Sequence, residues 1–201
     1  MPGRQPTPGE TPLEDLSGLR VQGVTTKAAL DALEAENVRR ATLKYLASKP
    51  TRLQARFDVE WMLALHAEMF GRVWKWAGTV RTAETNIGAR PRDIQVELHE
   101  LQRDLMAWEE SGMALEEQAV WLHHRAVQIH PFPNGNGRWA RMLANIWLAV
   151  HDAEPIEWPD ATIGTASAVR DEYLAAVRAA DRGEYAGLEA LHSRFRRSAP
   201  R

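Results

Sequence analysis

The sequence predicts an all-α protein with one small β element. Apolar residues recur at helical spacing, three or four positions apart, over most of the chain from residue 27 onward. Only residues 79–82 resemble a strand, and an irregular stretch up to Arg92 follows them. A short β-hairpin flap between two helices is the simplest interpretation of this region.

Three apolar stripes carry the clearest helix predictions. They are Val59, Met62, Leu63, His66, Met69 and Phe70; Ile94, Leu98, Leu101, Leu105 and Trp108; and Trp139, Met142, Leu143, Ile146 and Trp147. Asp58 is a suitable N-cap for the first of these helices. Further helices are expected at about residues 27–47, 114–129, 167–180 and 184–196.

The N-terminal stretch differs from the rest of the chain. Residues 1–24 contain four prolines and four glycines and no apolar periodicity, which predicts an irregular tail. Residues 25–201 are then one helical domain, because 201 residues leave little room for a second core.

Composition and charge exclude several functions. With 25 basic and 27 acidic residues, the net charge of −2 offers no basic excess, so direct nucleic-acid binding is not expected. The absence of cysteine excludes disulfides, thiol catalysis and thiolate zinc sites. No apolar run reaches membrane-spanning length and the N-terminus lacks a signal-peptide core, so a cytoplasmic protein with no membrane role is expected.

One segment, HPFPNGNGRWAR at residues 130–141, departs from the helical pattern. Gly135 and Gly137 allow backbone conformations that other residues avoid and let a ligand approach the main chain closely. Asn136 can cap the helix that begins here. The first amides of that helix lack internal partners and attract anions.

Charged and titratable side chains surround the same helix start. Arg138 and Arg141 are three residues apart, so they share one helix face and can hold the same polyphosphate. His130 can accept a proton near neutral pH, as a general base must. The alternative is a glycine-rich turn with surface side chains, but eight defined residues within twelve favour phosphoryl or nucleotidyl transfer.

At these residues the chain resembles the Fic (filamentation induced by cAMP)/Doc family, whose signature is H-x-F-x-[D/E]-[G/A]-N-[G/K]-R-x-x-R. The likeness extends to residues 121–124 before the loop, to 76–82 at the start of the flap and to 170–185, and it covers about residues 27–195. The loop wording is most similar to the mobile mystery protein B subgroup, which occurs beside a helix-turn-helix partner in bacteria.

The resemblance implies a Fic-type helical bundle and a protein adenylyltransferase. His130 would deprotonate a Ser, Thr or Tyr hydroxyl of a target protein, which attacks the α-phosphate of ATP. Arg138 and Arg141 would hold the phosphates. The anion hole would comprise Gly135, Asn136 and Gly137. The flap residues that register the target would be Thr85, Asn86, Ile87 and Gly88.

Asn134 departs from the family pattern, which has Asp or Glu there to help hold Mg²⁺. An amide offers a carbonyl oxygen without charge, so weak metal binding at Asn134 and reduced transfer are expected. A nucleotide-binding pseudoenzyme therefore stays open as an alternative, as do phosphate or phosphocholine transfer and an interaction protein paired with a helix-turn-helix partner.

Many Fic proteins block their own phosphate site with a glutamate in an S/T-x-x-x-E-G/N helix. Residues 32–37, ALEAEN, match only at the end, because Ala32 replaces the hydroxyl residue. An inhibitory role would pair Glu36 with Arg141, whereas an ordinary solvated helix face is the simpler interpretation.

Overall fold

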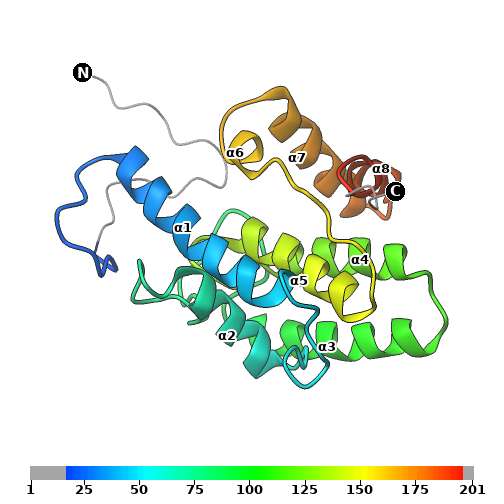
Figure 1. Ribbon diagram of the computed structural model, residues 1–201. Helices are drawn as coiled ribbons and strands as arrows, with labels where there is room; N and C mark the ends of the chain where they lie inside the picture. Colours follow the sequence, from blue (N-terminus) through cyan, green and yellow to red (C-terminus); the bar gives the residue numbers. More distant parts are fainter. Residues whose placement is uncertain (1–16, 197–201) are drawn as a thin grey trace.

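The computed structural model describes residues 17–196, and its helices pack around a central one (Figure 1). The elements are α1 (Lys27–Leu46), α2 (Val59–Phe70), α3 (Ile94–Glu110), α4 (Leu115–Ile129), α5 (Asn136–Val150), α6 (Asp160–Ile163), α7 (Ala168–Ala180) and α8 (Ala186–Arg194). Each helix expected from the apolar periodicity is confirmed, with its bounds shifted by a few residues at most. The four-residue helix α6 was not expected, because one turn carries no periodic signal.

Helix α5 is the centre of the structure. It packs against α4, α1 and α2, and α3 packs on α4 and α2. Trp139, Leu143 and Trp147 on α5 are fully buried in the main core. Helices α7 and α8 form a second apolar cluster with α4. In Figure 1 they are drawn together with α6 in the upper part of the view, above α4 and α5.

The segment at residues 79–92 forms no hairpin, which corrects the sequence prediction. Within residues 17–196 the only β pairing consists of two isolated bridges, Leu19 with Trp74 and Ile156 with Arg196. The amide of Arg81 donates to the carbonyl of Pro131 (2.9 Å), and the amide of Ala89 donates to that of Ile129 (3.1 Å). The main chain of this segment therefore pairs with the end of α4 and the α4–α5 loop, and its two arms form no β ladder with each other.

Part of the predicted N-terminal tail is described. Residues 1–16 lie outside the described part of the chain, and α1 begins at Lys27, where the Thr26 side chain accepts from the Ala29 amide. Residues 17–24 are anchored, because Arg20 N donates to Val73 O and Lys75 N to Gly18 O, both at 2.8 Å.

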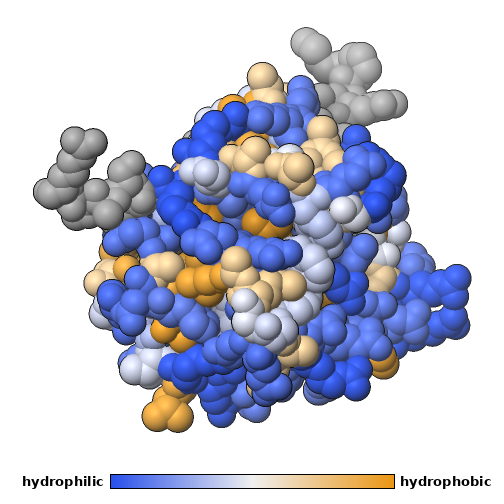
Figure 2. All heavy atoms as spheres, turned by 90° about the vertical axis from the view of Figure 1, so that its right-hand side faces the viewer, coloured by the Kyte–Doolittle hydropathy of each residue, from blue (hydrophilic) through white to orange (hydrophobic). Residues whose placement is uncertain are grey.

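The surface is predominantly polar on the face drawn in Figure 2, where apolar side chains form small, separated patches. None of the helices in the described region is both long and apolar enough to cross a lipid bilayer.

Three buried histidines predict that the fold loses stability in acid. Burial lowers the pKa of His66 and His192 to about 3 and holds that of His123 well below its usual value. Below about pH 6.5 the unfolded chain binds protons that the folded chain excludes, so the free energy of unfolding falls as pH decreases, by at most about 4 kcal/mol per pH unit for three groups. Urea unfolding at about pH 7 and about pH 5 measures this slope. The exposed His99 provides the control, since H99Q should leave the slope unchanged, whereas a flat profile for the native chain contradicts the prediction.

Candidate functional site

The loop between α4 and α5 is shaped by two left-handed residues and one side chain. His130 ends α4 with φ 51°, and Gly135 precedes α5 with φ 81°. The Asn136 side chain accepts from the Phe132 amide (2.9 Å) and donates to the Phe132 carbonyl (2.8 Å). Asn136 was expected to cap α5; instead it is the first helical residue, and its side chain holds the loop closed.

Glycine is required at position 135 by both conformation and space. A Cβ there would lie 2.7 Å from the Phe70 ring and 3.2 Å from the Nε2 of His66. Together with the positive φ, this close approach excludes a side chain.

The start of α5 presents unpaired amides. The backbone N–H groups of Asn136, Gly137 and Arg138 have no hydrogen-bond partner within residues 17–196, as expected for the first turn of a helix. The Gly135 amide, which the sequence placed in the anion hole, donates to the Asn134 side-chain oxygen (2.7 Å). The anion cradle in this structure therefore consists of the amides of residues 136–138.

Arg141 reaches this cradle from within the core. Its Nε and Nη2 donate to Asp160 on α6 (3.0 and 2.6 Å). Its Nη1 lies 3.4 Å from the position that a Cβ on Gly137 would take, so one nitrogen faces the start of α5. This contact of Asp160 was not predicted, because no sequence motif connects Asp160 to Arg141.

Arg138 is engaged by a buried carboxylate. Its Nη1 donates to Glu34 Oε2 (2.6 Å), and Glu34 also accepts from the Nε1 of Trp74 (2.6 Å). The guanidinium lies over the Phe70 ring, 4.7 Å from its centroid. Glu34 is 4% exposed, whereas the Arg138 side chain is 28% exposed, so the carboxylate is shielded from solvent and the guanidinium only partly.

The solvated helix face that the sequence favoured for Glu36 is confirmed, and the alternative, a pairing with Arg141, is not found. Glu36 lies on the exposed face of α1 and pairs with Arg39 and Arg40, both at 2.8 Å. A helix turns by about 100° per residue, so Glu36 and Glu34, two positions apart, face different sides of α1. Only Glu34 faces the functional loop.

His130 is suited to accept a proton. Burial, followed by the positive charge of Arg81, lowers its pKa to about 4, while an interaction with the Val127 backbone works in the opposite direction. The imidazole is therefore neutral at physiological pH, as a general base must be, although a pKa this far below 7 makes it a weaker base than a solvated histidine. Arg81 also fixes the main chain here, because its Nε donates to the His130 carbonyl (2.7 Å).

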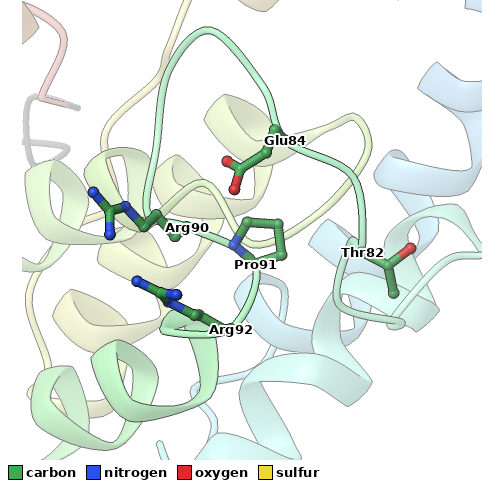
Figure 3. A pocket seen from close by; sticks show the side chains of 5 residues that line it. All are labelled: Thr82, Glu84, Arg90, Pro91 and Arg92. Carbon is green, nitrogen blue, oxygen red and sulfur yellow. The ribbon is translucent and has the colours of Figure 1, made fainter.

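The segment at residues 79–92 covers one side of His130. Gly88 has φ 96°, and a Cβ on it would lie 2.5 Å from the His130 Cβ, so only glycine allows this contact. The other expected flap residues, Thr85, Asn86 and Ile87, are exposed. Figure 3 shows this loop rising from Thr82 and returning at Arg90; an open cavity of about 410 Å³ is lined there by Thr82, Glu84, Arg90, Pro91 and Arg92.

Asn134 is the only position in the loop expected to contact a metal. Its Oδ1 already accepts from the Gly135 amide, and it carries no charge. No group of three or more His, Cys, Asp or Glu residues in the described ranges is arranged to hold a metal ion. A divalent cation here would depend mainly on oxygens that a ligand brings.

Residues 56–148 match the model of the Fic/DOC family. The fold is similar to that of BepC with bound AMPPNP from Bartonella tribocorum, with 17% identity, a TM-score of 0.65 and coverage of 89% of this chain and 91% of that one. It is also similar to the N-terminal Fic domain of a putative cell filamentation protein with bound ADP from Bartonella quintana, with 20% identity, a TM-score of 0.63 and coverage of 87% of this chain and 87% of that one. A third similar structure is Fic-1 (residues 134–508) from C. elegans, with 22% identity, a TM-score of 0.64 and coverage of 90% of this chain and 52% of that one. No curated protein matches the sequence.

The Glu34–Arg138 pair predicts a change in anion affinity. In E34Q the amide keeps an acceptor for Trp74 but releases Arg138, so a polyphosphate at the α5 cradle gains one charge-assisted contact. Calorimetry with a non-hydrolysable ATP analogue should show binding about tenfold tighter than in the native chain. E36Q, on the exposed face of the same helix, is the matched control and should bind as the native chain does. Unchanged or weaker binding by E34Q would show that Glu34 does not compete with the anion.

Proposed function

Because this chain carries a Fic/DOC family domain, we propose that it is a protein adenylyltransferase that moves AMP from ATP to a hydroxyl side chain of a target protein. The observation that carries the proposal is the start of α5, where three unpaired amides and one nitrogen of Arg141 converge. Such a cradle suits the phosphates of a nucleotide. The similar folds that hold AMPPNP and ADP support the use of a nucleotide at this site.

In the proposed transfer His130 is the only base that the reaction needs. The target hydroxyl oxygen attacks the α-phosphorus, and the imidazole of His130 takes the hydroxyl proton. A new P–O bond forms to the target, the bond from the α-phosphorus to the α–β bridging oxygen breaks, and pyrophosphate leaves with that oxygen. The charge that develops on the phosphate oxygens is stabilised by the cradle amides and Arg141.

Position 137 favours nucleotidyl over phosphoryl transfer. Gly137 stands where the family members that work as kinases carry Lys, and an added side chain would enter the space beside Arg141 Nη1. The bare backbone at this position leaves the cradle open to the α- and β-phosphates.

Mg²⁺, bound with the triphosphate, would neutralise phosphate charge during transfer. In this chain the side-chain oxygen of Asn134 would be the expected protein ligand, with the remaining ligands supplied by phosphate and water. Asn134 replaces a carboxylate, so slow transfer at low Mg²⁺ concentration follows from this proposal.

The target is expected to lie along residues 85–88. These residues follow Arg81, whose side chain and amide fix the base of the segment to the α4–α5 loop. The target backbone would pair with exposed main chain here and bring its hydroxyl to His130.

Transfer from ATP labelled at the α-phosphate tests the proposal. The native chain should label itself or a protein in a bacterial lysate, and H130A should lose at least about a hundredfold of the rate, since a general base contributes that much. H99A, at an exposed histidine of α3, serves as the control and should retain the native rate. No transfer from ATP, GTP, UTP or CTP with saturating Mg²⁺ or Mn²⁺ would contradict the proposal.

A second candidate function is nucleotide binding without transfer. It is favoured by Asn134, whose uncharged side chain is already bonded to the Gly135 amide. A protein of this kind would bind ATP at the same cradle and act through that binding alone.

Asn134→Asp separates the two candidates. Aspartate keeps an acceptor for the Gly135 amide and adds the charge that Mg²⁺ prefers, so the transfer rate should rise about tenfold and the Mg²⁺ concentration at half-maximal rate should fall. N134A, which removes both the acceptor and the metal ligand, should be slower than the native chain. If only N134D transfers label while the native chain merely binds ATP, nucleotide binding is the native function.

A further inference from the structure

His66 on α2 lies between two parts of the proposed site. Its ring stacks on Phe132, with the centroids 3.6 Å apart and the planes 13° from parallel. It is completely buried, although it belongs to neither the loop at residues 130–141 nor the segment at residues 79–92. In the sequence analysis it is one member of an apolar helical stripe, with no further role predicted for it.

The two ring nitrogens of His66 have different partners. Nδ1 accepts from the Gly78 amide (2.9 Å), at the beginning of the segment that leads to the flap. Nε2 lies 3.0 Å from the carbonyl oxygen of Asn134, in the loop that leads to the cradle. A backbone amide can only donate and a carbonyl can only accept, so Nδ1 must be bare and Nε2 must carry the proton.

The bond requirements therefore select one neutral tautomer. A doubly protonated ring would have no acceptor for Gly78, and the other neutral tautomer would lose both bonds. The geometry agrees with the burial, which lowers the pKa of His66 to about 3 and keeps the ring neutral.

Both partners of His66 are held closely against their surroundings. Gly78 has φ 80°, and a Cβ there would lie 2.8 Å from the Ala67 Cβ on α2. On the other side, Asn134 directly precedes Gly135, which approaches the ring of Phe70 too closely for a side chain. A shift of the His66 ring would therefore displace the flap base, the cradle or both.

We propose that His66 is a positioning residue that sets the flap and the phosphate cradle in register through its two ring nitrogens. The proposal rests on the proposed function for its purpose, because a target hydroxyl and a nucleotide phosphate must meet within bonding distance. It does not require His66 to contact either of them. The placement of the flap relative to the cradle can be measured without any adenylyl transfer.

Two substitutions separate the two bonds of His66. In H66N the side-chain oxygen lies near the position of Nδ1 and can accept from Gly78, but nothing reaches Asn134. In H66Q the terminal amide nitrogen lies near the position of Nε2 and can donate to Asn134, but Gly78 loses its acceptor. Both lose the stacking on Phe132, so the comparison between them cancels that loss. H66F keeps an aromatic ring and loses both bonds.

Amide hydrogen exchange on the full chain, without nucleotide, is the measurement. H66Q should exchange about tenfold faster than the native chain at residues 78–92 and as the native chain does at residues 134–139, where the hydrogen-bonded amides of Gly135 and Trp139 provide the readout. H66N should show the reverse. H66F should exchange faster in both segments. A non-hydrolysable ATP analogue with Mg²⁺ should bind H66N about tenfold more weakly and H66Q as the native chain does.

The outcomes are distinct. If H66N and H66Q change both segments equally, or change neither, His66 is only a packing residue and the proposal is overturned. If the segments separate as expected while the native chain transfers no label, the positioning role holds and the adenylyltransferase proposal fails. If the native chain transfers label but H66N and H66Q do not affect different segments, the adenylyltransferase proposal holds and the positioning role of His66 fails.

Discussion

The functional loop depends on the side chain of Asn136, which commits both ends of its amide to the backbone of Phe132. These two buried hydrogen bonds close the turn between α4 and α5 while the backbone amides of the first helical turn remain unpaired. If the side chain instead capped its own helix, one of those amides would be occupied. Removing it would leave buried polar groups unsatisfied, at about 1–3 kcal/mol for each. The cradle is therefore available because Asn136 bonds backward along the chain.

The two arginines at the cradle are positioned by carboxylates from distant parts of the chain. Asp160 accepts from two nitrogens of Arg141, and the third, Nη1, faces the start of α5. The ion pair therefore orients the guanidinium toward the cradle. Arg138 donates to the buried Glu34, and an anion must compete with that carboxylate. Both arginines thus bond to a carboxylate, but Asp160 leaves Arg141 Nη1 facing the start of α5 beside the Tyr173 hydroxyl, whereas Glu34 holds Nη1 of Arg138.

The sequence predicted what local patterns encode. Helical periodicity identified the major helices, and the glycines and arginines of residues 130–141 identified the loop. The hairpin prediction was wrong because the amides of Arg81 and Ala89 pair with carbonyls at the end of α4 and in the α4–α5 loop. These partners are about forty or more residues away in the sequence, and strand propensity does not report them. Glu34 and Asp160 were missed for a related reason: an acidic residue on a helix resembles any solvated one until the tertiary fold places an arginine beside it.

The flap and the cradle meet at the histidine that ends α4. Arg81 bonds to the His130 carbonyl, and Gly88 packs on the His130 Cβ, so residues 79–92 are built directly on His130. The cradle is connected to the same residue through the loop that Asn136 closes. His66 adds a second connection between the two, from the opposite side of Phe132. Two connections thus link His130, the start of α5 and residues 79–92, and under the proposed function they would hold the three in the geometry that an in-line attack on phosphorus requires.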